Sequence, residues 1–374
     1  MKQIQMVDLQ TQYKRLQKEI DEGIQNVIED AKFINGPAVK TFAANLADYL
    51  SVKHVIPCAN GSDALQIALM SAGIQPGDEV ITPDFTFIAT VEVVALLGAK
   101  PVLADVNPED FTIDVNQLES LITDKTKAIV PVHLFGQCAN MASIMNIARK
   151  HNLRVIEDTA QAIGSDYYIK DKPGKAGTLG DFGCTSFFPS KNLGCYGDGG
   201  ALYTNDDELA ATAKSITNHG STVKYHHDRI GVNSRLDAMQ AAILNVKLKN
   251  LDDFNRRRQA AAIFYDHHLE EIPEIAIPVK RDASSHSYHQ YTIKVPKGEN
   301  KKLQEYLKKH DIPSMIYYPI PLHKQAAFKE WTDDRTFPVS DELAERVLSL
   351  PMHTELTKEQ LTHICNTIKT YFHE

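Results

Sequence analysis

The lysine at position 191 has the surroundings that a reactive amine needs. It follows the strand-like segment 184–188 and the turn Pro189-Ser190, and the glycine-rich stretch 194–200 comes after it. Apolar, aromatic and small neighbours would desolvate the amine and lower its pKa, which makes a lysine nucleophilic near neutral pH. Taken alone, however, a lysine is more often a solvated surface residue, because lysines are seldom fully buried.

The turn Asn60-Gly61-Ser62-Asp63 has the form of an anion site. A tight turn into a helix leaves the first N–H groups unpaired, and the helix dipole favours negative charge there. Gly61 permits a close approach of the backbone, and Ser62 offers both its N–H and its hydroxyl. The alternative is a plain helix N-cap, for which serine is a preferred residue.

An acidic residue, Asp158, closes the strand-like segment 153–158. Open α/β folds build their sites at the carboxyl ends of strands. A carboxylate there needs a partner, which could be a protonated pyridine nitrogen, a metal ion or the N-terminus of a helix. Glu157 should point to the opposite side of the strand, because successive side chains alternate.

Short β-rich runs alternate with helical patterns between about residues 55 and 205. This alternation predicts an α/β fold with a mainly parallel central sheet flanked by helices. The helix after Gly61 should have Ser62 as its N-cap and should end at Gly73. The expected strands are residues 79–82, 101–106, 128–132, 153–158, 184–188 and 201–204.

The 374 residues exceed the usual size of one compact core. Residues 234–269 predict one or two extended helices, and two prolines follow them. We therefore expect a large domain over residues 1–250, with an N-terminal helical segment, and a smaller C-terminal α+β domain over residues 251–374. The smaller domain should contain a strand at 291–295, a polar helix at 299–310 and the Pro-rich turn 317–321.

Composition and simple motifs exclude several classes of protein. The formal net charge of −8 argues against a nucleic-acid binder. No stretch approaches the ~18 apolar residues of a membrane span, and the first residues contain no apolar signal region, so we expect a cytoplasmic protein without membrane contact. The five cysteines form no CxxC pair, which indicates neither a disulfide framework nor a zinc site. The sequence contains no GxxxxGK[ST] motif, which argues against hydrolysis of a nucleoside triphosphate. The glycine-rich residues 194–200 do not open a helix, which argues against a Rossmann dinucleotide site.

Taken together and in order, these segments resemble the DegT-type nucleotide-sugar aminotransferases, a branch of the fold-type I enzymes that use pyridoxal 5′-phosphate. The likeness runs from Val7-Asp8-Leu9 to Leu350-Pro351-Met352-His353. Its most specific segments are 61–65, 83–90, 157–161, 186–200 and 231–237.

The resemblance implies a role for each matched residue. Lys191 would hold the cofactor as a Schiff base, and Asp158 would pair with its pyridine nitrogen. Phe87 would stack on the ring, although core packing would be the preferred interpretation without the resemblance. Gln161 would lie beside the ring hydroxyl. The phosphate would be held by Gly61, Ser62, Asp63 and Ser186, and by Asn233 of the neighbouring subunit, which implies a homodimer with shared active sites.

The family's chemistry implies the reaction. L-Glutamate would leave as 2-oxoglutarate, and a nucleotide-linked keto-sugar would then take the amino group in a ping-pong scheme. Lys191 would move the proton, and Asp158 would keep the pyridine nitrogen protonated so that the ring accepts electrons.

The segments Cys58-Ala59-Asn60-Gly61 and 186–200 are most similar to UDP-2-acetamido-2-deoxy-3-oxo-D-glucuronate aminotransferases of bacterial surface-polysaccharide (lipopolysaccharide, O-antigen) synthesis. Arg235 would then bind the sugar carboxylate, with an ion pair between subunits as the alternative. Relatives often have His-Tyr where this chain has Tyr317-Tyr318, the other expected substrate residues. That departure leaves a dTDP-3-oxo-6-deoxyhexose as the main alternative substrate.

Two other classes of protein remain open. A pyridoxal-phosphate-dependent sugar dehydratase would have histidine in place of Lys191, which argues against that class. A regulator that binds the cofactor without catalysis would need a DNA-binding or membrane element, and the sequence indicates neither.

Overall fold

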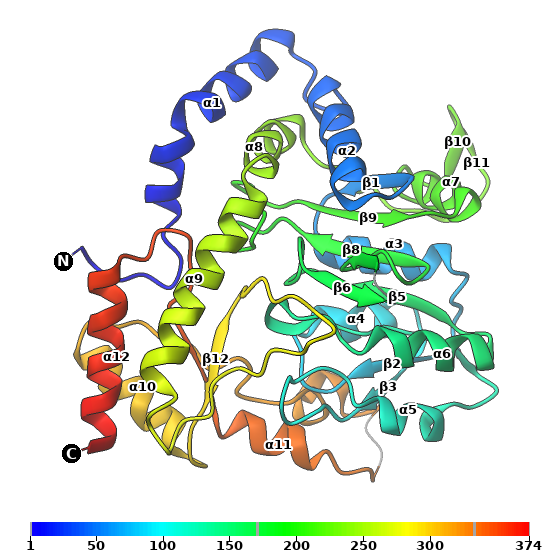
Figure 1. Ribbon diagram of the computed structural model, residues 1–374. Coiled ribbons are helices and arrows are strands. Elements are labelled where there is room, and N and C mark those ends of the chain that lie inside the picture. The colour runs from blue at the N-terminus through cyan, green and yellow to red at the C-terminus, as the bar shows by residue number, and fades with distance from the viewer. Residues whose placement is uncertain (1, 170–171, 332–333, 374) are drawn as a thin grey trace.

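The computed structural model describes residues 2–169, 172–331 and 334–373 (Figure 1). Its helices are α1 (Leu9–Asp30), α2 (Pro37–Leu50), α3 (Gly61–Ser71), α4 (Ala89–Leu96), α5 (Val115–Leu121), α6 (Met141–His151), α7 (Asp207–Ile216), α8 (Ala238–Leu248), α9 (Leu251–Leu269), α10 (Glu299–Lys309), α11 (Pro338–Ala344) and α12 (Lys358–His373), with short 3-10 turns η1 (Leu134–Gly136), η2 (Leu322–Lys324) and η3 (Ala326–Phe328). Its strands are β1 (His54–Cys58), β2 (Glu79–Pro83), β3 (Lys100–Ala104), β4 (Thr126–Ile129), β5 (Arg154–Asp158), β6 (Asp166–Ile169), β7 (Lys172–Lys175), β8 (Phe182–Ser186), β9 (Gly200–Thr204), β10 (Ser221–Val223), β11 (His226–His227), β12 (Tyr291–Lys294) and β13 (Val347–Leu350).

A seven-stranded sheet in the order β1-β9-β8-β5-β4-β2-β3 forms the centre of the molecule (Figure 1). The strands β8, β5, β4, β2 and β3 pair in parallel, whereas β9 is antiparallel to both of its neighbours. The predicted α/β class with a mainly parallel sheet is confirmed.

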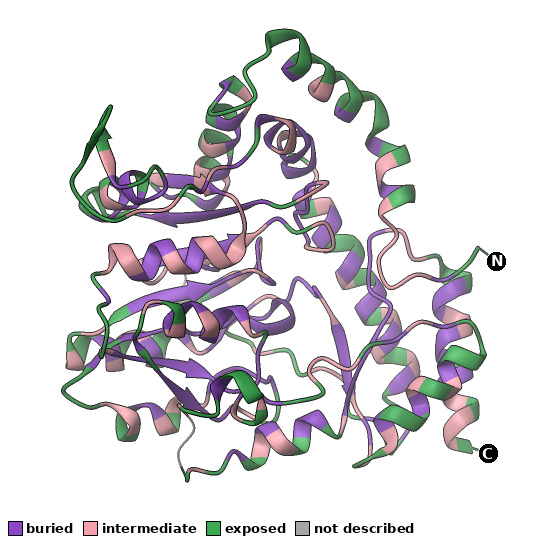
Figure 2. Ribbon diagram, turned by 180° about the vertical axis from the view of Figure 1, so that it is seen from behind, coloured by how far each residue is buried: buried purple, intermediate pink, exposed green. Residues whose placement is uncertain are grey.

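Helices cover both faces of this sheet because successive strand residues point to opposite sides. In β5, Ile156 joins the buried cluster that contains α3, α4 and α7. Its neighbour Val155 joins the cluster that contains α5 and α6. Figure 2 shows the strands of the sheet as buried, while the arm that carries β10 and β11 is exposed.

Each predicted strand is present, with its bounds shifted by a few residues at most. In the central sheet, β1 was not predicted, because Pro57 interrupts its apolar run, and the short strands β6, β7, β10, β11 and β13 outside that sheet were not predicted either. The structure tolerates this proline because β1 lies at the edge of the sheet. The prediction of Ser62 as the N-cap of α3 was wrong: Asn60 is the N-cap, and its Oδ1 accepts a hydrogen bond from Asp63 N (2.8 Å).

The C-terminal part has a hydrophobic core of its own. That core contains residues from α9, α10 and α12 and from the antiparallel pair β12–β13, and it also includes Ile4 from the N-terminus. The helix α9 contributes Leu251 and Phe254 to cores of the large sheet side and Tyr265 to the C-terminal core. The domain boundary near residue 250 stays a prediction, since α9 continues through both regions.

No described helix is long and apolar enough to cross a membrane.

Glu157 anchors the end of β5 from inside the protein. Its buried carboxylate accepts hydrogen bonds from the N–H groups of Gly177 (2.9 Å), Leu179 (2.7 Å) and Gly180 (2.6 Å), and it lies 2.8 Å from His133 Nε2. Both the Glu157 and His133 side chains are fully buried. The carboxylate therefore satisfies donors that water cannot reach.

We predict that Glu157→Ala lowers the free energy of unfolding by about 3–5 kcal/mol, because it leaves three N–H groups and Nε2 of His133 without a partner in the interior. Urea denaturation measures this change. The matched control is Glu29→Ala on the exposed surface of α1, which should change the free energy by less than about 0.5 kcal/mol. Equal effects of the two substitutions would contradict this account of Glu157.

Candidate functional site

A cavity of about 880 Å³ lies at the carboxyl ends of β5 and β8, next to the first turn of α3. Ten of the twelve predicted site residues line it: Gly61, Ser62, Asp63, Phe87, Asp158, Gln161, Ser186, Lys191, Tyr317 and Tyr318. Residues from the far C-terminal part thus meet residues of the large sheet in one cavity.

Two predicted residues, Asn233 and Arg235, do not line this cavity. Asn233 is exposed and forms an isolated β-bridge with Asn218. Arg235 is half-buried, and no described residue forms an ion pair or hydrogen bond with its guanidinium. Ser234, which lies between them, donates a hydrogen bond to Asp63 Oδ2 (2.5 Å) and so ties this segment to the first turn of α3.

The Lys191 side chain faces the cavity, and no described residue accepts a hydrogen bond from its Nζ. Burial lowers the pKa of this amine to about 8, although the negative charge of Asp158 acts in the opposite direction. At pH 8 about half of the Lys191 side chains are then unprotonated. The structure gives this lysine the desolvated and unpaired amine that the sequence analysis expected of a nucleophile.

Asp158 is held firmly at the end of β5. Its Oδ2 accepts a hydrogen bond from Thr90 Oγ1 (2.8 Å), and its Oδ1 accepts one from Ala160 N (3.1 Å). The residue is only 6% exposed, and it lines the cavity. A carboxylate oxygen can accept a further hydrogen bond, so Asp158 can also bind a cationic donor in the cavity.

Gln161 connects two distant parts of the cavity wall. Its Oε1 accepts a hydrogen bond from Phe135 N (2.8 Å), and its Nε2 donates one to the hydroxyl of Tyr318 (3.0 Å). Burial raises the pKa of Tyr318, so its hydroxyl stays protonated. The amide therefore has a fixed orientation beside Asp158.

The first turn of α3 offers unpaired donors to the cavity. Asn60 caps Asp63 N, which leaves the N–H groups of Gly61 and Ser62 without an acceptor among the described residues. A Cβ atom at Gly61 would lie 2.7 Å from Ser186 Cβ, so only glycine lets the two segments come this close. The carboxylate of Asp63 binds Ser234, and its predicted contact with phosphate stays a prediction.

The aromatic ring of Phe87 lies at the cavity with 55% of its surface exposed. This exposure excludes core packing, the alternative considered from the sequence. Its ring centroid is 6.3 Å from that of Tyr318. Two aromatic residues of different segments therefore lie next to one another at the cavity wall.

Several polar residues of the site were not predicted from the sequence, among them Thr90 and His289. Thr90 donates a hydrogen bond to Asp158. It lies in segment 83–90, which carried the family likeness, but it was not named as a site residue. His289 lines the cavity, is 5% exposed, and has no hydrogen-bond partner for Nδ1 among the described residues. Burial, with the positive charges of Lys191 and Arg258, lowers its pKa well below the usual value, so the ring is neutral. No sequence pattern marks His289, because its role depends on the segment that folds over Lys191.

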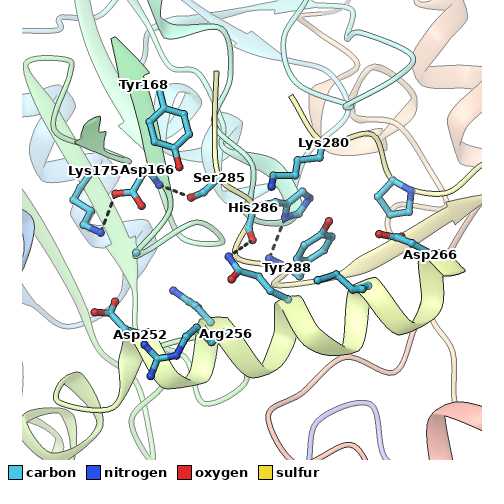
Figure 3. A pocket seen from close by; sticks show the side chains of 15 residues that line it. Asp166, Tyr168, Lys175, Asp252, Arg256, Asp266, Lys280, Ser285, His286 and Tyr288 are labelled. Carbon is cyan, nitrogen blue, oxygen red and sulfur yellow. Dashed lines mark hydrogen bonds and ion pairs between the residues drawn. The ribbon is translucent and has the colours of Figure 1, made fainter. Parts of the chain in front are cut away.

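A second pocket, of about 580 Å³, lies behind this segment (Figure 3). His286 and Tyr288 line it with parallel rings 3.9 Å apart, while His289 and Gln290 line the first cavity. Asn192, the neighbour of Lys191, donates hydrogen bonds to Asn255 Oδ1 (2.9 Å) and to Ser287 O (3.0 Å). Segment 286–290 is therefore a shared wall between the two pockets.

Comparisons with known proteins agree with this geometry. The DegT/DnrJ/EryC1/StrS aminotransferase family matches residues 14–369. The chain is 46% identical to the UDP-2-acetamido-2-deoxy-3-oxo-D-glucuronate aminotransferase of Pseudomonas aeruginosa, over 97% of this chain and 98% of the relative. It is 45% identical to the UDP-N-acetyl-3-dehydro-alpha-D-glucosamine 3-aminotransferase of Acidithiobacillus ferrooxidans, over 99% and 98% of the two chains. It is also 47% identical to a protein of Geobacillus stearothermophilus named a pleiotropic regulatory protein, over 99% and 98%.

The fold agrees as well. The crystal structure of DesV from S. venezuelae in complex with a ketimine intermediate superimposes with a TM-score of 0.95 and 36% identity, and covers 100% of this chain and 99% of that one. Sequence match, fold and cavity lead to one conclusion: the chain belongs to the DegT/DnrJ/EryC1/StrS aminotransferase family.

Proposed function

We propose that this protein transfers an amino group from L-glutamate to a nucleotide-linked 3-oxo sugar with pyridoxal 5′-phosphate as cofactor. The observation that carries the proposal is the amine of Lys191, which is unpaired, has a pKa of about 8 and shares its cavity with Asp158. Family membership supports the same chemistry.

The cavity fits the cofactor in three respects. The unpaired N–H groups of Gly61 and Ser62 at a helix N-terminus suit a phosphate group. Asp158 has an oxygen available for a protonated pyridine nitrogen, and the exposed ring of Phe87 suits stacking on a heterocycle. When bound, pyridoxal phosphate forms a covalent bond with an amine and withdraws electrons from the adjacent carbon.

The protein's own groups would supply the remaining chemistry. Asp158, fixed by Thr90, holds a proton at the pyridine nitrogen because a carboxylate stabilises the nearby cation. The amine of Lys191, whose pKa is lowered to about 8, is available as a base slightly above neutral pH and would remove the proton from the substrate Cα. The half-reactions with L-glutamate and with the sugar use the same two groups in turn.

For the sugar we propose UDP-2-acetamido-2-deoxy-3-oxo-D-glucuronate, and with it a role in bacterial surface-polysaccharide synthesis. The relative with this activity is 46% identical over nearly the whole chain. Arg235 is the cation proposed for the sugar carboxylate. It has no partner among the described residues, and Ser234 ties its segment to the cavity through Asp63.

One observation favours a second candidate, a 3-oxo sugar without a carboxylate. Among the described residues, Lys191 is the one lysine or arginine that lines the cavity, and the ring of His289 is neutral. The walls contributed by Met315, Ile316 and Phe188 are apolar. Such a cavity suits a UDP-linked acetamido sugar or a dTDP-3-oxo-6-deoxyhexose.

We also propose a homodimer whose subunits complete each other's sites. The arm with β10 and β11 carries exposed apolar residues, namely Val223 (62%), Tyr225 (83%) and Ile230 (85%). Exposed apolar groups of this kind are typical of protein interfaces. Asn233 is exposed outside its own cavity, as a residue that serves a partner subunit would be. The cytoplasmic location stays a prediction.

We predict that L-glutamate converts the absorbance of the bound aldehyde cofactor to that of its amine form, and that Lys191→Ala abolishes turnover. The reason is that this substitution removes both the covalent attachment and the base. Absorbance spectra and a coupled 2-oxoglutarate assay measure the two effects. Lys308→Ala on exposed α10 is the control and should behave as the wild type. Normal turnover by Lys191→Ala would refute the proposal.

Gly61→Ala should weaken cofactor binding about tenfold, because the new Cβ collides with Ser186 at the phosphate turn. Equilibrium dialysis followed by absorbance measures the affinity. In the control Gly23→Ala the added Cβ meets Ala242 Cβ at an ordinary 3.6 Å, so the affinity should stay unchanged. Unaltered binding by Gly61→Ala would show that the phosphate lies elsewhere.

Arg235→Ala should raise the KM for the UDP-3-oxo-glucuronate at least about tenfold, because a charged hydrogen bond to the carboxylate is lost. The KM for the UDP-3-oxo-glucosamine derivative should stay unchanged. Steady-state assays with both sugars, each made in place by a dehydrogenase, give the comparison. An equal loss with both sugars, together with a weaker dimer, would instead assign Arg235 to an ion pair between subunits.

A further inference from the structure

Two buried carboxylates at the ends of β2 and β3 hold the C-terminal part of the chain against the cavity. Asp84 follows β2 directly and is fully buried. Its Oδ1 accepts a hydrogen bond from His323 N, and its Oδ2 lies 2.7 Å from His323 Nδ1. Asp105 follows β3 and accepts hydrogen bonds from Val339 N and Ser340 N (2.9 Å each) at the start of α11.

His323 also joins these two attachments to each other. Its Nε2 lies 3.3 Å from Asp341 Oδ1 on α11, while its Nδ1 binds Asp84. The imidazole stacks on Phe337 with ring centroids 4.6 Å apart. We call Asp84, His323 and Asp341 the clasp. A doubly protonated imidazole suits it best, because the cation then donates a hydrogen bond to Asp84 and attracts the charge of Asp341, whose Oδ1 accepts no hydrogen bond from the described residues.

The clasp lies between the two segments that form one wall of the cavity. On one side, Asp84 is close in sequence to Thr86 and Phe87, which line the cavity. On the other side, His323 is close to Tyr317, Tyr318 and Pro319, which also line it. The two segments meet where Tyr318 packs near Phe85 and Phe87, with ring centroids 5.9 and 6.3 Å apart.

We propose that His323 is a positioning residue: in its protonated form it clasps segment 317–323 to the end of β2 and so sets the wall that receives the sugar. This inference rests on the proposed amino transfer to a nucleotide-linked sugar. Of the residues proposed for the cofactor, Lys191 and Asp158 belong to other elements, and Phe87 follows β2, which the central sheet holds in place. Release of segment 317–323 should therefore affect the sugar half-reaction more than cofactor binding.

Charges around His323 give the clasp a pH dependence. Partial burial by itself would lower the pKa of His323, but the hydrogen bond and charge of Asp84 and the charge of Asp341 outweigh it, so the pKa is raised above 6.5. Lys324, which pairs with Asp341, acts in the opposite direction, and the guanidinium of Arg335 lies 5.7 Å from the centre of the Phe337 ring. A raised pKa means that the clasp is complete below pH 6.5 and weakens as the pH rises through the higher value.

The single tryptophan of the chain reports on this region. Trp331 packs in the same hydrophobic cluster as Leu322 and Phe337, the neighbours of His323. Its fluorescence in the holoenzyme can therefore follow the clasp without any sugar present. The experiment combines this titration with the KM for a UDP-linked 3-oxo sugar, at saturating L-glutamate, between about pH 6 and pH 9.

In the wild type we expect one fluorescence transition above pH 6.5 and a parallel rise of the sugar KM by about fivefold, since a charge-assisted hydrogen bond is about twice as strong as a neutral one. The rate of the L-glutamate half-reaction should not follow this transition. His323→Asn keeps a neutral donor for Asp84 and should abolish the pH dependence of both readings. Asp341→Asn should move the transition to lower pH.

His54→Asn is the matched control, because His54 forms a 2.7 Å pair with Asp207 on the surface away from the cavity. It should keep the wild-type transition. The proposal would be overturned if His323→Asn kept the wild-type fluorescence transition, or if the sugar KM stayed constant across the pH range of that transition. If the wild type used no sugar at all, the proposed function would fail, while the fluorescence of His323→Asn would still decide whether the clasp exists.

Discussion

The site depends on the way in which β5 divides its last two residues between the interior and the cavity. Glu157 points inward, where three backbone N–H groups and His133 fix its carboxylate. Asp158 must then point to the other side, because side chains alternate along a strand. A strand anchored in this way cannot shift its register, so the carboxylate that faces the cavity has a fixed place relative to Lys191. The buried hydrogen bonds of Glu157 therefore also fix the position of the Asp158 carboxylate.

The cavity beside Asp158 holds two groups of opposite charge type, the amine of Lys191 and the carboxylate of Asp158. The proposed role of Lys191 needs an amine that loses its proton readily, and desolvation lowers its pKa to about 8. Asp158 lies in the same cavity, and hydrogen bonds from Thr90 and the backbone hold its carboxylate in place. Asp158 ends β5, and Lys191 follows the neighbouring strand β8 after a short turn. The parallel arrangement brings their ends to one edge, which explains why an α/β fold suits this chemistry.

The sequence was informative where local pattern decides the structure. Alternating apolar runs predicted the strands, and ten of the twelve expected site residues meet in one cavity. The sequence did not predict Asn60 as the N-cap of α3. Asn60 and Ser62 are both residues that can cap a helix, and the path of the backbone decides between them. Local pattern also gave no sign of His323 or of the bond between Gln161 and Tyr318, residues 157 positions apart. Such contacts depend on how the C-terminal part folds back over the sheet, which no periodicity encodes.

The shared wall formed by residues 286–290 has a consequence for how this protein can change. His286 and Tyr288 face the pocket of Figure 3, whereas His289 and Gln290 face the cavity of Lys191. A mutation that alters packing in the outer pocket can therefore shift side chains that line the cavity of Lys191. During evolution or directed selection, new sugar preferences can arise from substitutions that never touch the sugar. A library built to alter specificity should accordingly include both sides of this segment.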